Sequence, residues 1–124
     1  MHDDQREFLS DLLATASPSG FETPAQRVWV EYVERFADDV RTDDYGNAIA
    51  VYDGGDGPEI AVGGHADEIG FVVSAINSDG YLHLAPVGGS DKSVSKARQV
   101  HVHTADGPVN GVIGQAAIHV RDRD

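Results

Sequence analysis

A histidine and two acidic residues interrupt an otherwise apolar segment, Val62-Gly-Gly-His-Ala-Asp-Glu-Ile-Gly-Phe-Val-Val73. In an extended chain, residues two apart project to the same side, so the Asp67 carboxylate can accept the proton of one imidazole nitrogen of His65. That hydrogen bond fixes the tautomer, raises the basicity of the other nitrogen and directs it at a metal ion. The segment therefore predicts a metal ligand, His65, oriented by Asp67.

A single histidine does not make a catalytic zinc site, because such a site takes about three protein ligands plus a water. The chain contains no cysteine, so any further ligand must be His, Asp or Glu. Judged by spacing alone, a His65–Asp67 hydrogen bond at a strand end, with no metal bound, remains an open alternative.

The other histidines are weaker candidates. His101 and His103 share one face of a predicted strand and could bind a metal as a pair, although no third ligand lies nearby. The alternative is that both lie on a half-exposed strand without a metal. His119 has no role that can be derived, and His2 and His83 are expected at the surface.

Two further patterns are discounted as catalytic or binding sites. Glu68 could be taken for a general base, but in an extended segment it points away from Asp67, so a structural salt bridge is expected. The run Gly88-Gly-Ser-Asp-Lys-Ser93 resembles a phosphate-binding loop. It fails because Asp91 separates the lysine from the glycines and places negative charge where phosphate would bind.

Two helices are expected to precede the His65 segment. The first covers residues 5–15, and residues 17–20 interrupt it. The second begins with Thr23 as N-cap, Pro24 at the first helical position and Gln26 completing a capping box. Its apolar stripe is expected to form core packing and comprises Ala25, Val28, Trp29, Tyr32, Val33 and Phe36.

After residue 39 the apolar period changes from helical to alternating. A strand at 40–42, a turn at 44–47 and a strand at 48–52 are expected, followed by strands at 59–62 and 69–76 that flank the His65 segment.

The rest of the chain indicates only β-structure. A strand is expected at 81–85, and strand 99–103 is expected to pair with 109–113. The change from mixed elements to strands alone predicts two parts, residues 1–73 in an α/β arrangement and residues 74–124 in a β-rich one.

Charge is the dominant feature of the composition. Twenty-one acidic residues against nine basic ones give a net charge of −12, which argues against nucleic acid or an anionic membrane as a partner. The acids are spread along the chain, as in a salt-adapted surface, and an ordinary acidic protein is the alternative. Without an apolar run long enough to span a bilayer, or a signal peptide, a cytoplasmic location is expected.

Several motifs in this order resemble the M42 family of dinuclear metallo-aminopeptidases, the deblocking or tetrahedral (TET) aminopeptidases formerly labelled endoglucanases. They are Pro18-Ser-Gly-Phe-Glu22, Asp44-Tyr-Gly-Asn47, Gly64-His-Ala-Asp-Glu-Ile-Gly-Phe-Val-Val73, Pro86-Val-Gly-Gly89, Val100-His-Val-His103, and Gly111-Val-Ile-Gly114 with His119 shortly after.

The resemblance implies a fold and a site. Residues 1–73 would be the first part of an α/β catalytic domain, and residues 74–124 the first part of an inserted β-barrel dimerisation domain. His65 would bind one of two divalent ions, zinc or cobalt, and Asp67 would orient it. The family's bridging Asp, its Glu pair with the general base, and its later Asp and His are missing from this sequence.

The resemblance also implies a function. The complete protein would remove N-terminal residues from short peptides through a metal-activated water, and would assemble from dimers into a homo-dodecamer. The 124-residue chain alone is expected to be inactive. The alternatives are a non-catalytic truncated relative that serves in subunit contact, and a glycosidase, although no carboxylate pair with glycosidase spacing stands out.

Overall fold

The computed structural model describes residues 1–115, and within this range the side chain of Lys92 is left undescribed. The chain divides into two compact units, Met1–Gly88 and Gly89 onward. Predicted elements that involve residues 116–124, including His119, lie outside the described residues.

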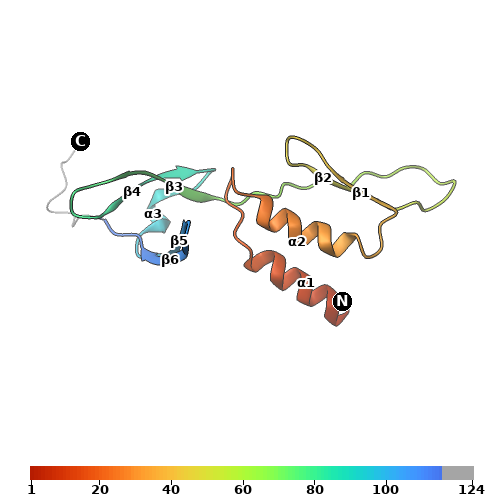
Figure 1. Ribbon diagram of the computed structural model, residues 1–124, viewed down its shortest axis with the longest axis horizontal. Coiled ribbons are helices and arrows are strands. Elements are labelled where there is room, and N and C mark those ends of the chain that lie inside the picture. The colour runs from red at the N-terminus through yellow and green to blue at the C-terminus, as the bar shows by residue number, and fades with distance from the viewer. Residues whose placement is uncertain (116–124) are drawn as a thin grey trace. The chain divides into compact units, whose positions relative to one another are not determined.

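Two helices open the first unit and pack against each other (Figure 1), α1 over Asp3–Ala14 and α2 over Thr23–Val33. Phe8 of α1 stacks on Tyr32 of α2 with ring centroids 3.8 Å apart, and Phe36 meets the same ring edge-on at 5.6 Å. Ala25 and Val33 are buried, which confirms part of the predicted packing stripe, while Phe36 follows the end of α2 and is 55% exposed.

The predicted start of the second helix is wrong in its capping. The N-cap is Glu22 rather than Thr23, and no side chain caps the helix. Gln26 instead donates from its side-chain amide to the carbonyl of Gly46, 2.7 Å away. A long-range contact to the 43–47 turn has therefore replaced the local capping box.

A β-hairpin follows the helices, with β1 over Asp39–Thr42 antiparallel to β2 over Ala48–Val51. Asp43 closes its turn, since its carboxylate accepts the backbone N–H of Tyr45 at 3.0 Å and of Asn47 at 2.9 Å, and the Asn47 amide at 2.8 Å. These bonds hold the pKa of Asp43 below its ordinary value, with the Asn47 side chain as the largest cause. The predicted strand–turn–strand is confirmed.

The predicted strand at 59–62 is absent, and residues 58–67 contain no regular secondary structure. Ile60 is 84% exposed and Val62 95% exposed, so the alternating apolar side chains have nothing to pack on within the described residues. A strand requires a neighbour for its backbone hydrogen bonds, and a favourable side-chain pattern does not supply one.

The second hairpin of this unit directly follows the His65 segment. It consists of β3 over Gly70–Ile76 and β4 over Leu82–Val87, with a bulge between Val73 and Ala75. The predicted strands at 69–76 and 81–85 are confirmed to within two residues. In this way β3, which begins at Gly70, fixes the chain shortly after His65 and Asp67.

The second unit contains a four-residue helix, α3 (Lys92–Ser95), and a hairpin of β5 (Gln99–Thr104) with β6 (Gly107–Val112). The hairpin is confirmed as predicted. The three sheets of the described residues are separate two-stranded antiparallel pairs, and no barrel is formed within them. Among all the residues that the structure describes, no helix is both long and apolar enough to cross a membrane.

Candidate functional site

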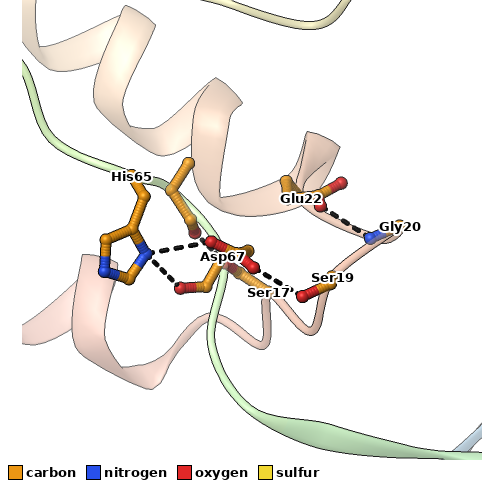
Figure 2. A network of polar contacts seen from close by, with 7 residues as sticks. Ser17, Ser19, Gly20, Glu22, His65 and Asp67 are labelled. Atoms are coloured by element: carbon orange, nitrogen blue, oxygen red, sulfur yellow. Dashed lines mark hydrogen bonds and ion pairs between the residues drawn. The ribbon is translucent and has the colours of Figure 1, made fainter. Parts of the chain in front are cut away.

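The predicted His65–Asp67 pair is present in the structure (Figure 2). His65 Nδ1 lies 2.9 Å from Asp67 Oδ1 and 2.9 Å from the Asp67 carbonyl oxygen. Both partners are oxygen acceptors, so Nδ1 carries the proton and the neutral ring keeps its lone pair on Nε2. The His65 side chain is 86% exposed and Asp67 40% exposed, so the carboxylate lies deeper than the ring that it orients.

A second donor holds the other oxygen of the carboxylate. Ser19 Oγ donates to Asp67 Oδ2 at 2.5 Å, so each carboxylate oxygen has its own partner (Figure 2). These bonds keep the pKa of Asp67 below its ordinary value, the Ser19 hydroxyl first and the His65 ring second. Asp67 is therefore stabilised as the ionised acceptor that the His65 ring requires.

The loop that carries Ser19 is bound to the motif through its backbone. Pro18 and Glu68 form an isolated parallel bridge, in which the N–H of Glu68 donates to the Ser17 carbonyl at 2.8 Å and the N–H of Ser19 to the Glu68 carbonyl at 3.4 Å. Gly70 lies against Pro18 so closely that a Cβ on Gly70 would be 2.9 Å from the Pro18 Cβ. The loop is thus held against the motif by backbone hydrogen bonds and by close packing of Pro18 on Gly70.

Ser17 makes the second attachment of the loop. It is only 4% exposed, and its hydroxyl donates to the carbonyl of Ala66. Its backbone N–H donates to Glu68 Oε1 at 2.8 Å. Glu68 therefore accepts from the backbone, and the salt bridge predicted for it is not formed with any described residue.

Of the other described histidines, His2 and His83 belong to the first unit and His101 and His103 to the second. His2 and His83 are exposed, as predicted. His101 and His103 are on β5, where His101 and Asn110 line an open hollow. Among residues 1–115 no group of three or more His, Asp or Glu side chains could hold a metal ion.

Sequence reasoning missed the contacts of Ser17 and Ser19: it treated residues 17–20 as a helix break and Pro18-Ser-Gly-Phe-Glu22 as a motif of the resemblance, without a role for either serine. The available signal was the polar run Ser17-Pro-Ser-Gly20, which is rich in hydroxyls for a simple interruption. Nothing in the spacing connects this run to Asp67, 48 positions later.

The geometry therefore defines an exposed histidine in the irregular segment before β3, with Nδ1 held by a carboxylate and Nε2 on the exposed ring. Comparison with known proteins gives the family of the chain. The sequence pattern described as M42 glutamyl aminopeptidase matches residues 46–124, more than half of the chain. The chain belongs to the M42 peptidase family.

Individual relatives agree with this assignment. Lysyl aminopeptidase of Pyrococcus furiosus is 33% identical over 93% of this chain and 33% of its own length. The crystal structure of a TET aminopeptidase from a marine sediment thaumarchaeal archaeon is 36% identical, with a TM-score of 0.90 over 98% of this chain and 34% of that one.

The TET1 peptidase of Pyrococcus horikoshii, described as assembling into a tetrahedron or a large octahedral shell, is 29% identical, with a TM-score of 0.71 over 95% of this chain and 36% of that one. The present chain thus spans about a third of the length of the relatives that it matches.

Proposed function

We propose that this chain is the N-terminal part of a metal-dependent aminopeptidase, in which His65 binds one ion of a dinuclear site and Asp67 orients the ring. The observation that carries the proposal is the Nδ1–H of His65 bound to Asp67 Oδ1 at 2.9 Å, which leaves Nε2 on a largely exposed ring. Membership in the M42 family supports the same reading.

The chemistry of the donor set fits one part of such a centre. A neutral imidazole with a carboxylate on its other nitrogen is a common ligand arrangement for zinc and for cobalt. Because residues 1–115 supply no group of three ligands, the other ligands and the general base must come from elsewhere in a complete subunit. Two such ions supply the Lewis acidity needed to hydrolyse a peptide bond.

Within this mechanism the described residues bind and orient. Asp67 holds the proton on Nδ1 and fixes the orientation of the ring, so that His65 presents the lone pair of Nε2 outward before a metal ion binds. The Ser17–Gly20 loop keeps the segment in place. None of these groups transfers a proton to the substrate, so we expect the isolated 124-residue chain to be inactive.

The proposed substrates are short peptides that lose their N-terminal residues. We also propose that the complete protein forms homo-oligomers, with dimers assembling into a dodecamer. The tetrahedral or octahedral assembly described for the Pyrococcus horikoshii relative supports the formation of a large homo-oligomer. A salt-adapted surface, suggested by the net charge of −12, and a cytoplasmic location complete the proposal. The division into a catalytic part, 1–73, and an inserted β-barrel part, 74–124, remains a prediction for the complete protein.

Metal content and peptidase activity of the native protein that carries this sequence test the proposal together. We expect about two zinc or cobalt ions per subunit, release of N-terminal residues from aminoacyl-p-nitroanilides, and loss of one ion and of activity in His65→Ala. A native protein whose metal content is unchanged by His65→Ala would refute the assigned role.

The same measurements separate the alternatives. A non-catalytic relative would retain almost no metal and hydrolyse no peptide, while a glycosidase would turn over polysaccharide but no aminoacyl anilide. Hydrolysis by the isolated 124-residue chain that is lost in His65→Ala would contradict the requirement for further ligands.

A further inference from the structure

We propose that Ser19 is a positioning residue for the His65 ligand, so that a chain of hydrogen bonds runs from Ser19 through Asp67 to His65. This inference rests on the proposed function of His65. It assigns to the loop before α2 a part in metal binding, in addition to its part in the fold.

The first argument is the division of the carboxylate oxygens. Asp67 Oδ1 accepts from His65 Nδ1 at 2.9 Å, and Oδ2 accepts from Ser19 Oγ at 2.5 Å. A carboxylate held at one oxygen can rotate about its bond to Cβ, while one held at both cannot rotate without breaking a bond. Ser19 therefore fixes the plane of the group that aims the imidazole.

The second argument is that the Ser19 hydroxyl is not needed to attach its loop. The loop is bound to the motif by the backbone bridge between Pro18 and Glu68 and by the hydroxyl and backbone N–H of Ser17. The Ser19 hydroxyl has Asp67 as its described partner. The two serines thus have separate tasks, Ser17 in holding the loop and Ser19 in holding the carboxylate.

The third argument is that Ser19 is itself held. The N–H of Phe21 donates to the Pro18 carbonyl at 2.7 Å, and the N–H of Gly20 donates to Glu22 Oε1 at 2.6 Å (Figure 2). Gly20 has a φ of +89°, which a residue with a Cβ rarely adopts. Because this turn is constrained, the Ser19 hydroxyl is held at a fixed position from which it donates to the Asp67 carboxylate.

The test titrates Co²⁺ into metal-free native protein and follows the visible absorption of the ion that His65→Ala removes, with unfolding measured in parallel. We expect Ser19→Ala to weaken Co²⁺ binding about tenfold, at the low end of the range for groups behind a metal ligand. Ser19→Thr, which keeps the hydroxyl, should recover most of that affinity. Ser10→Ala, an exposed helical serine, is the matched control and should bind Co²⁺ as the unmodified protein does.

Ser17→Ala and a double-mutant cycle distinguish positioning from a structural role. Ser17→Ala should lower the free energy of unfolding and leave Co²⁺ affinity largely unchanged. Ser19→Ala should weaken Co²⁺ binding and leave the free energy of unfolding largely unchanged. In an Asp67→Ala background, Ser19→Ala should change the Co²⁺ dissociation constant by less than about twofold, because its partner is gone.

Three results would overturn the inference. The first is unchanged Co²⁺ affinity in Ser19→Ala, and the second is a loss of affinity on Ser19→Ala that is as large in the Asp67→Ala background as in the unmodified protein. The third is a loss of affinity in Ser17→Ala and Ser19→Ala that is proportional to their loss of unfolding free energy. If His65→Ala loses its ion while Ser19→Ala binds normally, only this inference fails. If His65→Ala keeps both ions, the proposed function fails as well.

Discussion

Replacing Gly70 by alanine tests whether the contact between the Ser17–Gly20 loop and β3 holds the site together. The added Cβ would be 2.9 Å from the Pro18 Cβ, and neither atom is on a flexible side chain. Carbon atoms in contact lie about 3.5–4.0 Å apart, so the loop must withdraw by roughly 0.6–1 Å. Overpacking of this kind costs about 1–3 kcal/mol of stability.

The same displacement reaches the site. Moving Ser19 away by roughly 0.6–1 Å would stretch its 2.5 Å bond to Asp67 beyond the ordinary O–H···O range of about 2.5–3.0 Å. We therefore expect Gly70→Ala to weaken Co²⁺ binding at His65 by up to about tenfold. Urea unfolding of the native protein measures the first effect, and Co²⁺ titration of its metal-free form measures the second.

Two companion variants make the interpretation specific. Gly54→Ala adds a Cβ where no atom lies within 4 Å, so its stability should change by less than about 0.5 kcal/mol. In a Pro18→Gly background the contacted atom is gone, so Gly70→Ala should cost less there, with a coupling of about 0.5 kcal/mol or more. An equal cost in both backgrounds, or unchanged stability and Co²⁺ affinity in Gly70→Ala, would refute the reasoning.

Three other predictions concern the site and its supports. Asp67→Ala should weaken Co²⁺ binding about 10- to 100-fold in equilibrium dialysis, because the imidazole loses its carboxylate acceptor and keeps only the backbone carbonyl of residue 67; unchanged binding would contradict this. The folded-state pKa of Asp43 lies below its ordinary 3.8, so its contribution to the hairpin is present above that pH and lost as pH falls through the folded-state value. Asn47→Ala should raise this pKa toward 3.8 in a carboxyl-carbon NMR titration, and no change would exclude the Asn47 side-chain amide as the main cause. Tyr32→Ala should cost about 2–4 kcal/mol in urea unfolding because it removes two ring contacts, while Tyr52→Ala, at a residue 73% exposed, should cost less than about 0.5 kcal/mol.

Local patterns in the sequence were sufficient for the elements whose hydrogen bonds close within a few residues. Helices α1 and α2 follow from apolar spacing, and the strands of the three hairpins follow from alternating side chains on either side of turns such as residues 44–47. The pairing of His65 with Asp67 belongs to the same class, because residues two apart in an extended segment meet whatever the rest of the chain does.

The predictions that the described residues do not match concern features that depend on distant partners. Residues 59–62 have a strand pattern but no neighbouring strand among the described residues, so the pattern alone did not produce a strand. Glu68 was expected to form a salt bridge but accepts the N–H of Ser17, 51 positions earlier. Gln26 left its predicted capping box for the carbonyl of Gly46.

The sequence by itself determined the pairing of the His65 ring with the Asp67 carboxylate, because two residues and one backbone conformation are enough to define it. Only the tertiary structure decided what holds that carboxylate, since Ser19 reaches Asp67 through a bridge between segments 48 residues apart. Spacing in sequence carries no information about such a contact, because folding brings the two segments together through the backbone pairing of Pro18 with Glu68 and the close approach of Gly70.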